Sequence, residues 1–251
     1  MNDITKVATA VILAAGRGSR FNEAGKYRPK GFIEVQGKPI IERSIELLLS
    51  VGIKKIIIVT GHLADFYEKL SEKYPSIITI QNMKYADSGS MYSLFQLEGL
   101  VNNDFILLES DLVYEVKALN VLLQTTMKDC LLISGFTKSG DEVWVNAPNG
   151  RLYGLSKDQN ELSKIHGELV GITKVSAPLF KAMCDVAKQF FITSLHMEYE
   201  TALAKTAHEY AIPCLKINDL IWAEIDNEEQ LKNVRENIYP RISLQNRSSD
   251  E

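Results

Sequence analysis

Hydrophobic and polar residues alternate in blocks along the first half of the chain. Nearly continuous apolar runs of strand length predict strands buried on both faces, as in a parallel sheet covered by helices. These predicted strands lie at residues 7–15, 54–60, 76–81 and 104–109. Between these strands, apolar residues recur at the spacing of a helix. They predict helices between Pro39 and Gly52, from Ala64 to Lys73, and, after the third strand, up to Leu97. We therefore expect right-handed βαβ crossovers and a doubly wound, mixed but mostly parallel sheet flanked by helices, which is a Rossmann-like α/β fold.

The middle of the chain has a different pattern. Four strand-like segments with polar turns between them lie at residues 130–136, 142–147, 151–155 and 168–175. Helices at 177–191 and 197–210, a late strand at 212–217 and a last helix at 228–237 follow. This pattern predicts a small β lid with an acceptor pocket, at about residues 130–200, inside a single domain that spans 1–244. Residues 245–251 are polar, and we expect a frayed tail or a linker there.

The composition is that of an ordinary globular domain. Of 251 residues, 45% are hydrophobic and 24% are charged, with a formal net charge of −4. A nucleic-acid binder would carry a basic excess, so we expect no such partner. The three cysteines are odd in number and lack metal-binding spacing, which favours free thiols in a reducing cytoplasm. No secretory or membrane-spanning segment is evident, and the sequence does not decide whether the chain forms a homo-oligomer.

A glycine-rich and cation-rich loop follows the first predicted strand. Gly16 and Gly18 lack Cβ atoms, so backbone N–H groups there can approach a polyphosphate closely. The cations of this segment are Arg17, Arg20, Lys26, Arg28 and Lys30. The loop is not a Walker motif, because Lys30 follows a proline and no Ser or Thr comes next. Two glycines after a buried strand are also common in turns, so the loop alone leaves a purely structural interpretation open.

One carboxylate stands where a metal ligand is expected. Asp111 follows the predicted strand 104–109, and a Mg²⁺ ion on a triphosphate needs carboxylates from rigid positions. Asp111 could equally begin a helix. Further along, Asp226-Asn-Glu-Glu229 has the form of a helix-capping box.

The spacing of these motifs resembles a known family. Leu13-Ala-Ala-Gly16-x-Gly18-x-Arg20, then Pro29-Lys30 and Lys38-Pro-Ile-Ile41, resembles the nucleotidyltransferases that activate sugar phosphates and phosphoalcohols. The resemblance implies that Lys30 and Arg20 are catalytic and that Asp111 and Asp226 hold Mg²⁺, with Glu224 as a helper. It also implies a set of nucleotide-binding residues, namely Leu13, Ala14, Ala15, Gly16, Gly18, Lys30, Asn82, Ser88, Gly89 and Ser90.

Other segments resemble particular members of this family. Tyr85 to Ser93 looks like the cytidylyltransferases that act on phosphocholine and on phosphonates, which implies CTP as the nucleotide. Arg28-Pro-Lys-Gly-Phe32, Lys38 to Arg43 and His196-Met-Glu-Tyr-Glu200 look most like the enzymes for 2-aminoethylphosphonate. Some of those are fused to a transaminase, which a polar linker at the end of this chain would fit.

The acceptor is expected to carry an ammonium group. An aromatic face and nearby carboxylates suit such a cation. The candidate acceptor-binding residues are Asp111, Asp141, Trp144, Glu198, Tyr199 and Glu200. Trp144 could instead be an ordinary strand residue, and Glu198, Tyr199 and Glu200 could lie on different faces of a helix. Because acids outnumber aromatics here, we expect a primary amine. The resemblance implies CTP as the donor and pyrophosphate as the leaving group.

Three alternatives remain at this stage. Phosphocholine is a close rival as the acceptor. A sugar-1-phosphate nucleotidyltransferase is a second alternative, for which the chain is short and the acceptor region rich in acids. The third is a catalytically dead nucleotide-binding module, which predicts the loss of Lys30 or Asp111; both residues are present.

Overall fold

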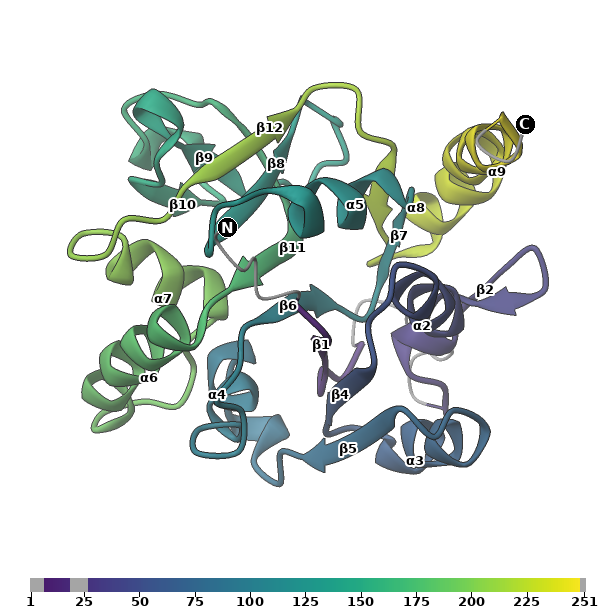
Figure 1. Ribbon diagram of the computed structural model, residues 1–251, viewed down its shortest axis with the longest axis horizontal. Helices are drawn as coiled ribbons and strands as arrows, with labels where there is room; N and C mark the ends of the chain where they lie inside the picture. The colour runs from purple at the N-terminus through teal and green to yellow at the C-terminus, as the bar shows by residue number, and fades with distance from the viewer. Residues whose placement is uncertain (1–6, 19–26, 249–251) are drawn as a thin grey trace, which may run out of the picture.

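The computed structural model describes residues 7–18 and 27–248, and a nine-stranded mixed sheet runs through its centre (Figure 1). Four neighbouring strands of the sheet are parallel, namely β1 (Thr9–Ala14), β4 (Lys55–Thr60), β5 (Ile77–Gln81) and β6 (Phe105–Glu109). β1 pairs with β4 on one side and with β6 on the other. Because all six residues of β1 are buried, its continuous apolar run follows from burial on both faces.

The other half of the sheet is built around a long antiparallel strand, β11 (Gly167–Val175). One edge of β11 pairs first with β9 (Trp144–Asn146) and then with β6, and the other edge pairs with β8 (Cys130–Ser134). β10 (Gly154–Ser156) extends the sheet beyond β9, and β12 (Cys214–Ile217) pairs in parallel with β8. The prediction of a mixed, mostly parallel sheet is therefore confirmed, and the predicted β lid region contributes β8, β9, β10 and β11 to this sheet.

Helices cover both faces of the sheet. α4 (Ser90–Phe95), α6 (Ala177–Phe191) and α7 (Tyr199–Thr206) share a hydrophobic core with Val11 and Leu13 of β1. α2 (Ile40–Ser50), α3 (Ala64–Lys73) and α5 (Lys117–Gln124) share a second core with Ala10 and Ile12. Successive residues of β1 thus point to opposite cores, as the period of a strand requires. Among the described residues, no helix is long and apolar enough to cross a membrane.

A separate two-stranded sheet, whose first strand follows β6 in the chain, was not predicted. β7 (Leu112–Tyr114) pairs antiparallel with β13 (Trp222–Glu224), so Glu224 lies opposite Leu112. The backbone N–H of Ile225 then donates to the carbonyl of Asp111, over 3.1 Å. This pairing brings the late acidic segment beside the strand end that carries Asp111.

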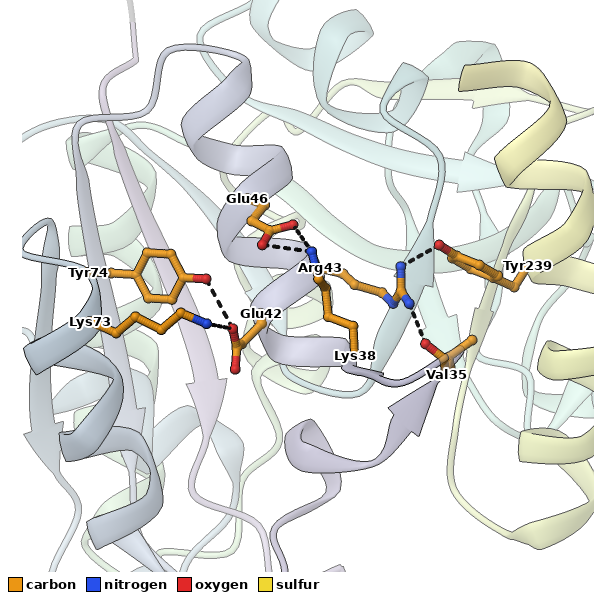
Figure 2. A network of polar contacts seen from close by, with 8 residues as sticks. All are labelled: Val35, Lys38, Glu42, Arg43, Glu46, Lys73, Tyr74 and Tyr239. Carbon is orange, nitrogen blue, oxygen red and sulfur yellow. Dashed lines mark hydrogen bonds and ion pairs between the residues drawn. The ribbon is translucent and has the colours of Figure 1, made fainter. Parts of the chain in front are cut away.

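The C-terminal helices are fastened to the start of α2. α8 (Glu228–Asn233), a π-helical turn (Val234–Ile238) and α9 (Tyr239–Ser248) pack beside the hairpin of β2 (Glu34–Val35) and β3 (Lys38–Pro39). Figure 2 shows Arg43 of α2 between this hairpin and α9, where it donates to the carbonyl of Val35 and to the hydroxyl of Tyr239. α9 therefore extends helical structure into the segment that was predicted to be a polar tail.

Short 3-10 turns complete the described fold. They lie at Lys30–Phe32, Tyr85–Asp87, Pro148–Gly150 and Gln159–Glu161. The first follows the cation-rich loop, and the second leads from β5 toward α4. Both lie beside the carboxyl ends of the parallel strands, where ligands bind in open α/β sheets.

Candidate active site

A cleft of about 880 Å³ lies at the carboxyl ends of β1, β6 and β8. Most of the predicted site residues line it, although they come from distant parts of the sequence. They are Leu13, Ala14, Ala15, Gly16, Gly18, Lys30, Ser88, Gly89, Ser90, Asp111, Asp141, Glu198, Tyr199, Glu200, Glu224 and Asp226. Asn82 and Trp144 are not part of this lining, and Arg20 lies outside the described residues.

The glycine loop packs closely against the segment that carries Lys30. Gly18 has a φ of +61°, which suits glycine, and a Cβ there would lie 3.2 Å from Cγ of Lys30. A Cβ on Gly31 would lie 3.1 Å from the hydroxyl of the buried Tyr67 and 3.3 Å from the carbonyl of Ser110. These two glycines therefore let Lys30 lie between the loop after β1 and the end of β6.

Lys30 joins two carboxylates that are remote in sequence. Its Nζ atom lies 3.0 Å from Oδ2 of Asp111 and also contacts Oδ1 of Asp226. The side chain of Lys30 is only 19% exposed. Burial alone would lower its pKa, but the two carboxylates outweigh burial and raise the pKa above the ordinary value, so the ammonium stays charged.

A third acid beside Asp111 escaped the sequence analysis. Carboxylate oxygens of Glu109, Asp111 and Glu224 lie within 4.8 Å of one another. Burial, followed by repulsion from neighbouring acids, raises the pKa of Glu109 well above its usual range and that of Glu224 to about 10. Such crowding of acids is relieved by a cation, and hard carboxylate oxygens are the donors that Mg²⁺ prefers. The donor set therefore fits Mg²⁺, and the position of Glu109 two residues before Asp111 was the available sequence signal.

The capping residue of α8 is Asn227, one position later than the predicted box. The side chain of Asn227 accepts from the backbone N–H of Gln230 at 2.9 Å. In return, Oε1 of Gln230 accepts from the backbone N–H of Asp226 at 2.6 Å. Because the cap uses Asn227, the carboxylate of Asp226 can contact Lys30 instead of the helix.

Asn82 does not line the cleft but holds two serines that do. It is fully buried, and its Nδ2 atom donates to the hydroxyls of Ser88 and Ser93, each over 3.0 Å. Gly89 has a further reason to be glycine, because a Cβ there would lie 2.4 Å from the carbonyl oxygen of Met197. The polar loop after β5 is thus an ordered support that connects α4 with the start of α7.

The three predicted acceptor-binding residues at the start of α7, Glu198, Tyr199 and Glu200, make different contacts. Oε2 of Glu198 accepts from the backbone N–H of Ser90 at 3.0 Å and from its hydroxyl. The hydroxyl of the buried Tyr199 donates to Glu109. Glu200 is different: its Oε2 atom is buried and has no hydrogen-bond partner in the part of the chain that the structure describes. Burial is the main cause that raises the pKa of Glu200 to about 7.

Trp144 does not line the cleft. Its ring packs edge-on against Phe136, at 5.7 Å between ring centroids, and Phe136 itself lines the cleft with 61% of its surface exposed. Asp141 lines the cleft as well, and its Oδ1 atom lies 2.8 Å from Nζ of Lys157. The aromatic side chain that faces the cleft from this region is therefore Phe136.

Comparisons with known proteins agree with this fold. Residues 10–125 match the MobA-like NTP transferase domain. The chain is 32% identical to the choline-phosphate cytidylyltransferase of Streptococcus pneumoniae over 152 residues, which are 57% of this chain and 66% of that protein. It is 28% identical to the 2-aminoethylphosphonate cytidylyltransferase of Lancefieldella rimae over 171 residues, 67% of each chain. The structure of the inositol-1-phosphate CTP transferase from T. maritima superposes with a TM-score of 0.76 at 20% identity, over 93% of this chain and 98% of that one.

Lys30 and Asp111 of the lysine–carboxylate site both lie within the segment that matches the MobA-like NTP transferase domain. That segment, residues 10–125, is just under half of the chain. Both of the sequence relatives described above are cytidylyltransferases. The match spans just under two thirds of the S. pneumoniae protein, so the match does not by itself assign that protein's substrate to this chain.

Proposed function

We propose that this chain is a nucleotidyltransferase that transfers CMP from CTP to 2-aminoethylphosphonate and releases pyrophosphate. The observation that carries the choice of acceptor is the buried oxygen of Glu200, which has no hydrogen-bond partner among the described residues and lies in the cleft that also holds Lys30. A buried carboxylate oxygen without a donor is costly, and an ammonium N–H supplies the missing donor.

The transfer is an in-line displacement at the α-phosphorus of CTP. A phosphonate oxygen of the acceptor forms the new bond to that phosphorus, while the bond to the bridging oxygen breaks and pyrophosphate leaves with its electron pair. The acceptor oxygen is already an anion at neutral pH, so no general base is needed. Catalysis then depends on positioning and on stabilisation of charge.

Lys30 is the catalytic cation in this proposal. Its raised pKa keeps it protonated, and its contacts with Asp111 and Asp226 hold it between the strand ends. It would neutralise the equatorial oxygens that gain charge on the α-phosphorus. Backbone groups from Leu13 to Gly18 would seat the nucleotide, and Arg20 would hold the β and γ phosphates.

The acid cluster is the proposed Mg²⁺ site. Asp111 and Asp226 would hold the ion, with Glu224 and Glu109 beside them. A bound Mg²⁺ supplies positive charge that neutralises the triphosphate. Tyr199 keeps Glu109 in place through its hydroxyl.

The acids around Glu200 favour a primary amine over a quaternary one. Glu198 and Asp141 line the same cleft, and a primary ammonium can donate up to three hydrogen bonds to such groups. Phosphocholine is the second candidate, and the 32% identity to a choline-phosphate cytidylyltransferase supports it. A quaternary ammonium cannot donate to Glu200 and would depend on aromatic faces such as Phe136.

Pyrophosphate release tests the proposal. CTP is offered in parallel with 2-aminoethylphosphonate, phosphocholine, phosphoethanolamine and glucose 1-phosphate. The proposal predicts the highest kcat/KM with 2-aminoethylphosphonate. A higher value with phosphocholine would select the second candidate, and turnover with glucose 1-phosphate alone would contradict both. Replacing CTP by UTP, ATP or GTP tests the choice of nucleotide.

A further inference from the structure

Residues 135–143, which we call the flap, join β8 to β9 and arch over β11. The register of the sheet fixes where the arch stands: Glu168 of β11 lies opposite Ser134, the last residue of β8, and also opposite Trp144, the first residue of β9. The flap therefore leaves the sheet on one side of Glu168 and returns on the other side. Its residues line the cleft from Gly135 to Val143, with Gly140 as the exception.

The side chain of Glu168 holds the flap from below. It is only 1% exposed, and its Oε1 atom accepts from the backbone N–H of Thr137 at 2.8 Å. Its Oε2 atom accepts from the hydroxyl of Thr137 at 2.7 Å. The backbone of Lys138 lies close enough to favour the charged form of this carboxylate and so to lower its pKa, against the larger effect of burial. Lys138 has a φ of +61°, and left-handed residues in a turn help successive N–H groups converge on an anion.

A buried acid at this position needs an explanation beyond stability. Isolated burial of a carboxylate is unfavourable, and among the described residues the hydrogen-bond donors to Glu168 come from Thr137 of the flap. Charge-assisted hydrogen bonds are about twice as strong as neutral ones, so Glu168 fixes the flap more firmly than an amide would. A further contact of the flap is the ion pair of Asp141 with Lys157. The Lys157 side chain is 56% exposed, and such surface pairs contribute little.

We propose that Glu168 is a positioning residue that sets the acceptor-binding end of the cleft by anchoring the flap. Glu168 is not part of the cleft lining, so it acts through Thr137 and Lys138, which are. The order of the strands separates the two ends of the cleft. β1 leads to the nucleotide loop and β8 leads to the flap, and two strands, β6 and β11, lie between them. Neighbouring strands are about 4.8 Å apart, so loosening the flap changes the acceptor end and leaves the nucleotide loop in place.

Kinetics of Glu168→Gln test this proposal, which rests on the proposed function. Glu168→Gln keeps the shape of the side chain but removes its charge. The KM for the acceptor should rise about tenfold, as expected for the loss of one charge-assisted hydrogen bond, while kcat and the KM for CTP stay within about twofold. The matched control is Glu161→Gln, which removes an exposed carboxylate that accepts from Ser156 at 2.6 Å and should change neither KM. An unchanged acceptor KM, or an equal rise in both KM values, would overturn the proposal.

A second measurement needs no substrate. Lys138 is a trypsin site within the flap, so anchoring can be followed as the rate of cleavage after Lys138 in the free enzyme. Glu168→Gln should speed this cleavage about tenfold. Thr137→Val removes one of the donors to Glu168 and should speed the cleavage less. In the double variant, Thr137→Val should add little to the effect of Glu168→Gln, because both changes remove the same contact. Wild-type rates in both variants would overturn the proposal. If the wild-type enzyme turns over no acceptor, the proposed function fails, and the cleavage rates still decide whether Glu168 anchors the flap.

Discussion

The ammonium nitrogen of Lys30 lies 3.0 Å from Oδ2 of Asp111, a residue 81 positions further along the chain. Lys30 follows the cation-rich loop, and Asp111 follows the strand that pairs with β1. The contact therefore joins the loop expected to hold phosphates to the acids expected to hold a metal.

Loss of the Lys30 charge should abolish most of the turnover. Lys30→Met is expected to lower kcat by about a thousandfold, because the charge that develops on the α-phosphorus loses its neutralising partner. The measurement is steady-state pyrophosphate release, with circular dichroism to confirm folding. Lys38→Met is the matched control, since it removes a lysine whose ion pair with Glu46 is exposed. A rate for Lys30→Met within tenfold of wild type would remove Lys30 from the mechanism.

A divalent ion should be required for activity. Chelation by EDTA is expected to stop turnover, and excess Mg²⁺ to restore it, because the crowded acids beside Asp111 cannot bind a triphosphate without a cation. Asp111→Asn should raise the Mg²⁺ concentration needed for half-maximal rate by at least about tenfold. Asp219→Asn is the control, since Asp219 forms an exposed ion pair with Lys117. Full activity in EDTA would exclude the metal from the mechanism.

Binding of the acceptor should weaken as the pH falls through about 7. The pKa of Glu200 is raised to about 7, chiefly by burial, so below that pH its carboxylate takes up a proton and loses its attraction for an ammonium. A primary amine keeps its charge throughout this range, since its ordinary pKa is about 10. The KM for 2-aminoethylphosphonate should therefore rise between pH 8 and pH 6.

Glu200→Gln provides the control for this titration. The variant should have a high KM at every pH and should lack the Glu200 part of the pH dependence. Titration of the phosphonate group of the acceptor affects both enzymes equally, so the difference between the two profiles isolates Glu200. Identical profiles in the two enzymes would show that Glu200 does not bind the ammonium.

The attachment of α9 should contribute to stability. Arg43 donates to Tyr239 and to the carbonyl of Val35, and its guanidinium lies 4.3 Å from the centre of the Tyr239 ring (Figure 2). Arg43→Met should lower the free energy of unfolding by about 2 kcal/mol, and Tyr239→Phe by about 1 kcal/mol. Urea denaturation followed by circular dichroism measures both. Values within 0.5 kcal/mol of wild type for both variants, on the scale of ordinary surface substitutions, would mean that this contact is dispensable.

Strong periodicity and the strand ends could be read from the sequence. The predicted helices at 64–73 and 177–191 coincide with α3 and α6, because each combines a clear apolar face with one defined end. Pro75 follows the first helix, and Ser176 caps the start of the second. The parallel strands were equally clear as continuous apolar runs. Lys30, Asp111, Glu224 and Asp226 were named as site residues from their motifs, and the fold brings them into one cleft.

Long-range pairing was harder to predict. β7 and β13 have three residues each and become strands only because they pair with each other across a large sequence separation. The role of Glu109 depends on that pairing, since it places Glu224 near the end of β6. The capping register was ambiguous for a different reason: Asp226 with Glu229 and Asn227 with Gln230 both fit the motif, and only the backbone geometry selects Asn227.

A crystal structure with Mg²⁺ and a CTP analogue that cannot be cleaved between its α and β phosphates tests the central claim most directly. The claim is that Lys30 and the carboxylates of Asp111 and Asp226 act on one nucleotide. The account predicts the Lys30 ammonium within hydrogen-bonding distance of an α-phosphate oxygen, and a Mg²⁺ ion bound by that phosphate and by Asp111 and Asp226. A nucleotide bound elsewhere, or a metal held away from its phosphates, would contradict the account.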